Sequence, residues 1–493
     1  MAGLRSRCST KVLRPERCVI LDGKPCAACA EDIELEKEIK ELESMIDKIH
    51  IRRSELRTAM NENHDRLISK FPPEIASHIF TQYSPPSTFS KEFGYDNPLY
   101  LGAVCQKWRQ LAWATPELWT SLHIVPHEKY CLGDLPKLAT EWLERSASLP
   151  LTIILQDYWG WVNEDDASGV INILNTHSAR WRDVHLDLPA RHLHRFSGLS
   201  QENILRRVLL SQPRYGLWPC GFSTFSMQSK PMLTDLTLTR VGLRCIDILW
   251  NNLTAASVNH IGLDESLELI RLAPLLETLT LQAINPSSDV FPIPDTRIVR
   301  LHLHALELLE IWKEAVLTGI LDSLCLPSLE QWIHNRSHFP LNNMISFGCL
   351  SPCLKKLEID IEHVDYHQLT RFLSRLSSPE CLCTSHDFSQ SDHEKLIDLL
   401  CISAQSPLFL PRLQSLEFLW DSFPCKSLPQ IFALSHWQSL RVKVDTPRGW
   451  HDAQVDVETV KLLLELVDRG YSLSIVRHSK FDLLQEYKEN WLP

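Results

Sequence analysis

The feature that most constrains the fold is a short leucine pattern that recurs from Trp181 onward in this 493-residue chain. Each copy approximates LxxLxL, with Ile, Val or another apolar residue in some positions. Because side chains alternate between the two faces of a strand, each LxL predicts a short strand whose leucines face a shared core. The segments are WRDVHLDL at Trp181, LTDLTLTR at Leu233, VNHIGLDE at Val258, LETLTLQA at Leu276, IVRLHLHA at Ile298, LDSLCLPSLEQW at Leu321, LKKLEIDI at Leu354, LQSLEFLW at Leu413 and the weaker SLRVKVDT at Ser439.

Helical or irregular return segments separate these strands, for example ASGVINILNTHS, LRCIDILWNN, YHQLTRFLSRL and HEKLIDLLC. One strand with its return cannot bury its own apolar face, so such units must stack on neighbours. Central segments begin 18 to 25 residues apart, close to the spacing of leucine-rich repeats, but later steps reach 33 residues and more. The Asn or Cys that normally follows the repeat strand is mostly missing. Residues 138–493 therefore resemble a degenerate leucine-rich-repeat solenoid; an ordinary α/β domain with a mainly parallel sheet is the alternative.

Residues between the strand leucines should face away from the core, on the exposed side of the sheet. Extended surfaces of this kind bind protein segments, so these residues form the predicted substrate face. The pairs His192/His194 and His302/His304 stand at alternate positions, which on a strand places both rings of a pair on one face. Simple solvent exposure is the preferred interpretation of each pair over a metal-binding or pH-sensing role. The predicted substrate face comprises Thr237, Thr280, Gln282, His302, His304, Glu358, Asp360 and Glu417.

Residues 31–70 carry a different pattern, which predicts one long helix. Apolar residues alternate steps of four and three, with Arg53 and Asn63 filling the remaining positions of the seam. The seam thins after Ile49, which favours a single helix lying along the next domain; homotypic or antiparallel coiled-coil pairing is the alternative. The apolar residues are Leu35, Ile39, Leu42, Ile46, Ile49, Leu56, Met60 and Leu67.

Residues 1–30 are basic and are expected to form a flexible tail. They lack the apolar stretch of a secretory signal, and a mitochondrial transit segment is disfavoured by Pro15 and by the absence of an amphipathic period. Cys26 and Cys29 form a CxxC pair, with Cys8 and Cys18 further back, which could supply part of a zinc site; a poorly ordered tail is the simpler interpretation. No apolar run approaches ~18 residues, so no transmembrane helix is expected.

Residues 71–122 predict three short helices. In FPPEIASHIF, prolines open the first helix, Glu74 lies in its first turn, and Ile75, Ile79 and Phe80 share one face. After a polar stretch, LYLGAVCQKWRQLAW has helical period. TPELW then starts a third helix, with Thr115 as its N-cap and Pro116 as its first residue.

These residues resemble an F-box, a small three-helix motif with the pattern LPxEI…IF, VCxxWRxLA and TPxLW. Phe71 stands where the family usually has Leu, and the loop from Ser84 to Asn97 is longer than in the shortest F-boxes. A long helix before the box and the phrase WLERSASLPLTIIL after it (Trp142 to Leu155) resemble the F-box proteins expanded in mushroom-forming fungi. The expected fold class is therefore α+β to α/β: a long helix, an F-box and an irregular solenoid of short parallel strands with helical returns.

The resemblance implies a partner and a role. F-boxes bind the Skp adaptor, which hangs on a cullin scaffold carrying a ubiquitin-charging enzyme. The chain would then be the substrate-recognition subunit of a ubiquitin ligase, performing no chemistry itself, with the repeats holding an unidentified protein substrate. A non-catalytic scaffold acting through the N-terminal helix and repeats is the alternative. The residues implied to contact the adaptor, or to support those contacts, are Phe71, Pro72, Ile75, Ile79, Phe80, Val104, Cys105, Trp108, Arg109, Leu111 and Trp119.

Composition and motifs give little support to other classes of function. The formal net charge of −11 does not favour nucleic-acid binding, and no GxxxxGK[ST], GxGxxG, HExxH or GxSxG motif is present. The 15 scattered cysteines indicate reduced thiols in the cytosol or nucleus. The segment ECLCTSHDFSQSDHE offers Cys381, Cys383, His386 and His393 to zinc, but a polar loop between two helices is the preferred interpretation. No catalytic residue, metal, cofactor, nucleic acid or membrane is expected.

Overall fold

A computed structural model describes residues 26–64, 66–83, 98–125, 135–157, 164–198, 200–213, 224–362, 364–386, 393–420, 425–434, 437, 440–446, 457–477, 481–482, 484–485 and 488. Their contacts divide the chain into two units, Met1–Trp119 and Thr120–Pro493. No helix within those ranges is both long enough and apolar enough to cross a membrane.

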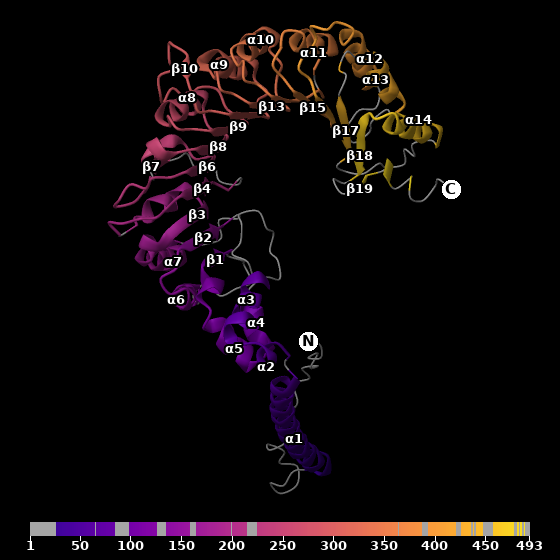
Figure 1. The fold of residues 1–493 in the computed structure, drawn as a ribbon. Helices are drawn as coiled ribbons and strands as arrows, with labels where there is room; N and C mark the ends of the chain where they lie inside the picture. The colour runs from indigo at the N-terminus through magenta and orange to yellow at the C-terminus, as the bar shows by residue number, and fades with distance from the viewer. Residues whose placement is uncertain are drawn as a thin grey trace. The chain divides into compact units, whose positions relative to one another are not determined.

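The first unit is helical (Figure 1). A long helix covers most of the predicted range 31–70: it begins earlier, at Ala27 inside the segment expected to be a tail, and ends at His64, and a short second helix follows from Arg66. Most of the expected tail lies outside the described residues. Its helices are α1 (Ala27–His64), α2 (Arg66–Lys70), α3 (Pro73–Tyr83), α4 (Pro98–Val104), α5 (Gln106–Trp113) and the 3-10 helix η2 (Pro116–Trp119).

The second unit is built on a single large sheet whose strands follow one another in chain order. Fifteen described strands belong to it, and every pair of neighbouring strands is parallel except the last, β18 with β19. The strands are β1 (Ser121–Ile124), β2 (Leu151–Gln156), β3 (Trp181–Asp187), β4 (Arg207–Ser211), β6 (Asp235–Thr239), β8 (Ala255–Asn259), β9 (Thr278–Gln282), β11 (Ala305–Leu309), β13 (Gln331–Asn335), β14 (Lys356–Asp360), β15 (Cys381–His386), β16 (Ser415–Trp420), β17 (Arg441–Thr446), β18 (Ser472–Arg477) and β19 (Phe481–Asp482).

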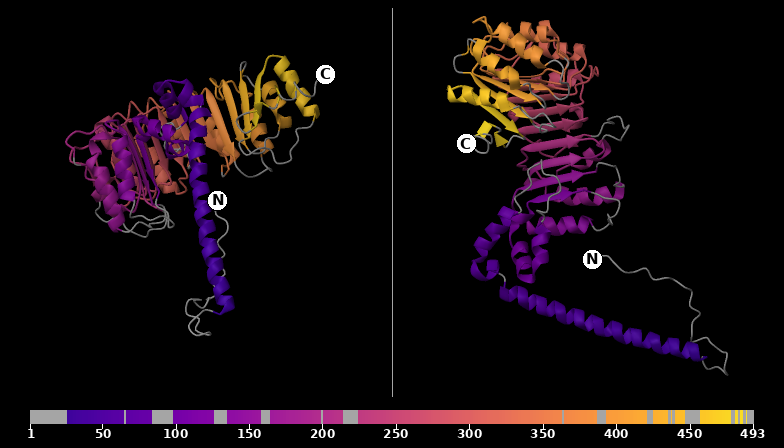
Figure 2. Two further views of the ribbon diagram at one scale, coloured as in Figure 1. Left: turned by 90° about the horizontal axis from the view of Figure 1, so that it is seen from below. Right: turned by 90° about the vertical axis from the view of Figure 1, so that its right-hand side faces the viewer.

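The described helices of this unit all lie on one side of the sheet. Figures 1 and 2 show the strands along the inner side of a curve and the helices along its outer side. Two pairs of two-residue strands, β5 (Phe225–Ser226) with β7 (Ile246–Asp247) and β10 (Ile298–Val299) with β12 (Leu324–Cys325), form small separate sheets. The helices are α6 (Leu135–Arg145), α7 (Glu164–Thr176), α8 (Leu263–Leu272), α9 (Glu314–Ser323), α10 (Leu341–Cys349), α11 (Tyr366–Leu373), α12 (His393–Ser403), α13 (Leu428–Leu434) and α14 (Val457–Asp468).

The core lies between sheet and helices, and the strand leucines supply much of it. In β6, Leu236 and Leu238 are buried while the residues between them are half-buried, and most central strands repeat this alternation. The prediction of short parallel strands with apolar residues on one face is therefore confirmed. The fold is mixed α/β with one extended parallel sheet.

Three predicted strands are misplaced. VNHIGLDE overlaps only the end of β8, IVRLHLHA ends where β11 begins, and LDSLCLPSLEQW contains the two-residue β12 and only the start of β13. In each case buried apolar residues outside the sheet strand mimic its pattern: Ile261 follows β8, Leu303 precedes β11 and Leu326 precedes β13. LRCIDILWNN is also not an α-helix, since it contains two 3-10 turns and β7.

Five successive central strands end in the same unusual turn. The residue after each strand is not glycine, yet it adopts a left-handed backbone with φ between 47° and 58°. In four of these turns its N–H donates to the last carbonyl of the next strand, as from Glu310 to Asn335 at 2.9 Å. This hydrogen bond extends the hydrogen-bond ladder between the two strands by one step. It offsets the conformational cost of the left-handed backbone, which is about 1–2 kcal/mol per residue. The five residues are Arg240, His260, Ala283, Glu310 and Arg336.

Candidate protein-docking surfaces

The first candidate surface is a row of exposed apolar side chains along α3. Ile75, Ile79 and Tyr83 stand four residues apart on α3, so they lie one above another on a single helix face, and the exposed Phe71 lies two residues before the helix begins. Their exposed fractions run from 38% to 48%. Contiguous exposed apolar side chains are typical of protein interaction sites, since burying them removes apolar area from water. We call Phe71, Ile75, Ile79 and Tyr83 the α3 row.

The opposite face of α3 forms the core of the unit. Ala76 and Phe80 are buried, and the Phe80 ring lies 4.8 Å from the half-buried Trp108 ring of α5, measured between centroids. Trp119 is fully buried and donates its indole N–H to the Ala112 carbonyl at 2.8 Å. Phe80 and Trp119 are among the residues that the resemblance implies contact the adaptor or support those contacts. Both side chains are buried in the core, and this burial separates Phe80 from the face that carries Ile75 and Ile79.

The remaining predicted adaptor residues differ in exposure. Val104, Pro72 and Arg109 are exposed, while Cys105 and Leu111 are half-buried. Cys105 is the N-cap of α5, and its Sγ accepts the Trp108 N–H at 3.4 Å. The Arg109 Nε donates to the Gly102 carbonyl at 2.8 Å, which ties α5 to the end of α4.

Packing between α4 and α5 depends on a glycine. The ring of Trp113 lies against Gly102 so closely that any Cβ at this position would overlap it. Trp113 also meets Trp119 edge-on, with 5.3 Å between ring centroids. The third predicted helix is the short η2, and the Thr115 hydroxyl before it lies 2.8 Å from the Leu111 carbonyl and 3.0 Å from Ser77 Oγ. These contacts hold the helices that present the α3 row.

The second candidate surface is the face of the sheet opposite the described helices. Strand pairing aligns Thr237, Thr280, Glu358 and Glu417 in one row across β6 to β16. Six of the eight predicted substrate-face residues therefore lie on strands and point away from the leucine core: Thr237, Thr280, Gln282, Glu358, Asp360 and Glu417.

Neither histidine pair lies on a strand. His302 and His304 precede β11 and lie in the turn, where both are exposed and the His304 Nδ1 lies 3.1 Å from the Ser328 carbonyl. His192 and His194 belong to the 3-10 helix η5 (Ala190–Arg195), in which His192 is buried and His194 exposed. Neither pair shares a strand face.

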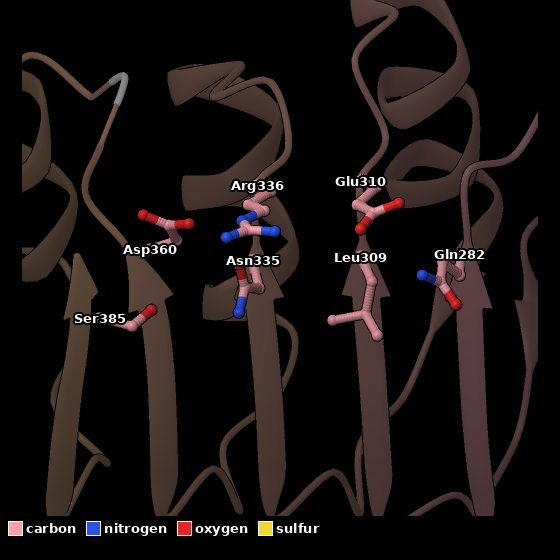
Figure 3. A pocket seen from close by; sticks show the side chains of 7 residues that line it. All are labelled: Gln282, Leu309, Glu310, Asn335, Arg336, Asp360 and Ser385. Carbon is pink, nitrogen blue, oxygen red and sulfur yellow. The ribbon is translucent and has the colours of Figure 1, made fainter. Parts of the chain in front are cut away.

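A hollow of about 300 Å³ opens at the carboxyl ends of β9, β11, β13, β14 and β15 (Figure 3). Two of its lining residues, Glu310 and Arg336, are the left-handed residues that follow β11 and β13, so the repeated turn places their charges at the strand ends. The Asp360 Oδ1 accepts the Glu362 N–H at 2.9 Å. The Asn335 Oδ1 and Ser385 Oγ are buried without a hydrogen-bond partner among the described residues. The lining residues are Gln282, Leu309, Glu310, Asn335, Arg336, Asp360 and Ser385.

Below this hollow the same sheet face carries a group of carboxylates. Burial raises the pKa of Glu358, and the neighbouring Glu307 and Glu417 raise it further, against the opposing effect of Lys356. The Lys356 Nζ lies 3.6 Å from the Glu358 Oε2. Burial alone would lower the pKa of Lys356, but the adjacent acidic groups outweigh it and the pKa is raised. A cationic side chain from a partner would relieve the repulsion among these three glutamates.

In the segment that offers Cys381, Cys383, His386 and His393 to zinc, the first three residues lie on a strand and His393 begins α12, while residues 387–392 lie outside the described residues. Cys381 to His386 form β15, and burial raises the pKa of Cys381 to about 11, with Glu417 adding to the effect. Burial also raises the pKa of Cys383. Thiols with such pKa values stay protonated at neutral pH, whereas zinc and nucleophilic chemistry use thiolates. No group of three or more potential metal ligands occurs within the described ranges.

Several residues of these surfaces escaped prediction from the sequence. Glu307, Glu310, Asn335 and Arg336 belong to β11 and β13 or to the turns after them, the strands whose positions were wrongly predicted. The correct alternation was present in ALELL and QWIHN, but the leucines before each strand gave a stronger pattern. Tyr83 could have been found from its spacing of four from Ile79.

Comparison with known proteins adds no assignment, since no protein-family model matches the chain and no curated protein is significantly similar to it.

Proposed function

We propose that this protein is the substrate-recognition subunit of a Skp–cullin–F-box ubiquitin ligase. In this proposal Met1–Trp119 contains an F-box that docks the Skp adaptor, and Thr120–Pro493 is an irregular leucine-rich-repeat solenoid that holds a protein substrate. The protein performs no chemistry and works in the cytosol or nucleus. It brings the substrate near ubiquitin carried by the cullin-bound enzyme.

The observation that carries the proposal is the α3 row on a small helical unit with its own core. Three apolar side chains of α3, together with Phe71 just before the helix, remain partly exposed, although Ala76, Phe80 and Trp119 are buried. Interface anchors are typically large aliphatic or aromatic side chains surrounded by less important contacts. The row coincides with Phe71, Ile75 and Ile79 of the motif that resembles an F-box. This agreement between motif and exposure supports adaptor docking.

The uncovered sheet face is the proposed substrate receptor. Parallel strands stacked in chain order present a long, continuous row of side chains, as a solenoid does. The carboxylates of Glu307, Glu358 and Glu417, together with the unpartnered acceptors of the hollow, favour a substrate segment that offers donors such as Lys or Arg. We therefore propose a basic segment of a protein as the ligand of β9 to β16.

Co-purification tests the adaptor step. The full chain should retain a co-expressed Skp adaptor through size exclusion, and Ile75→Asp should abolish that retention while the chain stays folded. Trp108→Ala should weaken retention through lost support, since Trp108 is half-buried against Phe80. A folded protein without adaptor affinity would favour the alternative of a non-catalytic scaffold, for which the exposed apolar residues of α1 are the supporting observation.

A further inference from the structure

Helix α1 carries an apolar seam that nothing in the described chain covers. Leu35, Ile39, Leu42, Ile46, Ile49, Leu56 and Met60 are 47% to 65% exposed. The helix has 38 residues and is therefore about 57 Å long. Isolated helices gain little stability in water, and most helical stability comes from packing of an apolar face. A seam of this length needs a partner helix.

The residues of the seam favour a two-stranded coiled coil. Steps of four and three place Ile39 and Ile46 at a positions and Leu35, Leu42 and Leu56 at d positions of successive heptads. A narrow seam of apolar a and d residues, flanked by charged e and g positions, is suited to packing against one other seam of the same kind. The partner helix must therefore supply one seam of matching length, which a second copy of α1 does.

Charge decides the direction of pairing. From Ala27 to Asp47 the helix carries eight Asp or Glu and two Lys, whereas from Lys48 to His64 it carries four Lys or Arg and two Glu. In a parallel, in-register pair, the flanking g and e positions would join Glu31 to Glu36, Glu38 to Glu43 and Arg52 to Arg57, so all three charged pairs would repel. An antiparallel pair instead lays the acidic half of one helix along the basic half of the other.

We propose that α1 binds a second copy of itself as an antiparallel coiled coil. The register that aligns the whole seam places Ile46 of one chain opposite Ile49 of the other, so that Ile39 faces Leu56, Leu35 faces Met60 and Leu42 packs against the aliphatic part of Arg53. This register brings Glu36 of one chain to Arg57 of the other, an oppositely charged contact, and Glu43 to His50, each contact present twice by symmetry. No like-charged flanking pair remains between Leu35 and Met60. The inference does not depend on adaptor binding.

Charge reversal of the full-length chain distinguishes the possible arrangements, with sedimentation equilibrium as the readout. In the antiparallel register Glu36→Arg and Arg57→Glu each convert two attractive pairs into two repulsive ones, so each variant alone should raise the dimer dissociation constant about tenfold or more. An equimolar mixture of the two variants should restore dimerisation, because every such contact then joins Arg to Glu. In a parallel pair each single variant would instead dimerise more tightly.

Glu34→Arg is the matched control. It loses an exposed ion pair to Lys37 at 3.6 Å, as Glu36→Arg loses one to Lys40 at 3.6 Å, but it occupies a c position outside the interface. Ile46→Asp should abolish dimerisation, and Ser44→Asp on the outer face should not. Circular dichroism should show that each variant keeps its helical content at high concentration. A parent chain that stays monomeric, tighter dimers of the single variants, or a mixture that dimerises no better than either variant would each overturn the proposal.

Discussion

Truncating Ile75 and Ile79 of the α3 row to alanine should weaken adaptor binding. The expected loss of binding free energy depends on how much of each side chain is exposed in the free protein. Ile75 is 47% exposed and Ile79 38% exposed, so each can still bury nearly half of its side chain in a complex. Full burial of an isoleucine contributes up to about 3 kcal/mol, so the exposed parts correspond to roughly 1 kcal/mol each. The double variant Ile75→Ala/Ile79→Ala should therefore lose about 2 kcal/mol of binding free energy, a rise of about 30-fold in Kd.

Isothermal titration of the purified chain with a purified Skp adaptor measures this change. Ile402→Ala is the matched control, because Ile402 lies on α12 in the other unit and is 61% exposed. It should leave the Kd unchanged. Both variants should unfold at the parental midpoint, since the replaced groups lie outside the core. A Kd that changes less than threefold in the double variant would refute the assignment of this row as the adaptor contact.

Three further predictions concern stability, measured by urea unfolding. Burial lowers the pKa of His334 to about 4, so between pH 6.5 and 4 the unfolded chain binds a proton that the native state does not, and stability falls. His334→Gln should reduce the loss between pH 7.5 and pH 5 by about 2 kcal/mol; an unchanged pH profile would contradict this. The buried Asp264 carboxylate accepts N–H bonds from Ser288, Val290 and Phe291, so Asp264→Ala should cost about 2–4 kcal/mol. Gly102→Ala should displace Trp113 and cost about 1–3 kcal/mol, whereas a neutral result would exclude that contact.

The sequence was sufficient to predict the sheet but not the exact position of every strand. Leucine alternation follows from the pleat, so LTDLTLTR, LETLTLQA and LKKLEIDI predict β6, β9 and β14. Around β8, β11 and β13 the pattern misleads, because buried leucines and isoleucines also lie in the turns beside a strand. Burial alone cannot tell these positions apart.

The candidate surfaces were predictable to different degrees. A spacing of four identifies Ile75 and Ile79 as neighbours, but only packing shows that Phe80 turns inward against Trp108. The hollow was not predictable, since its shape depends on left-handed turns at residues such as Glu310 and Arg336. A residue with a left-handed backbone is usually Gly, Asn or Asp, so its position can often be predicted from the sequence. None of these three residue types occupies the left-handed position in these turns.

Adaptor binding is the central claim, and the molar mass of the complex tests it most directly. Light scattering of the full chain mixed with excess Skp adaptor should show a stable complex with one adaptor per chain. The same measurement on Ile75→Asp should show the two proteins eluting separately. If the parent chain, folded and with its α3 row intact, elutes free of a tenfold excess of adaptor, the account is contradicted.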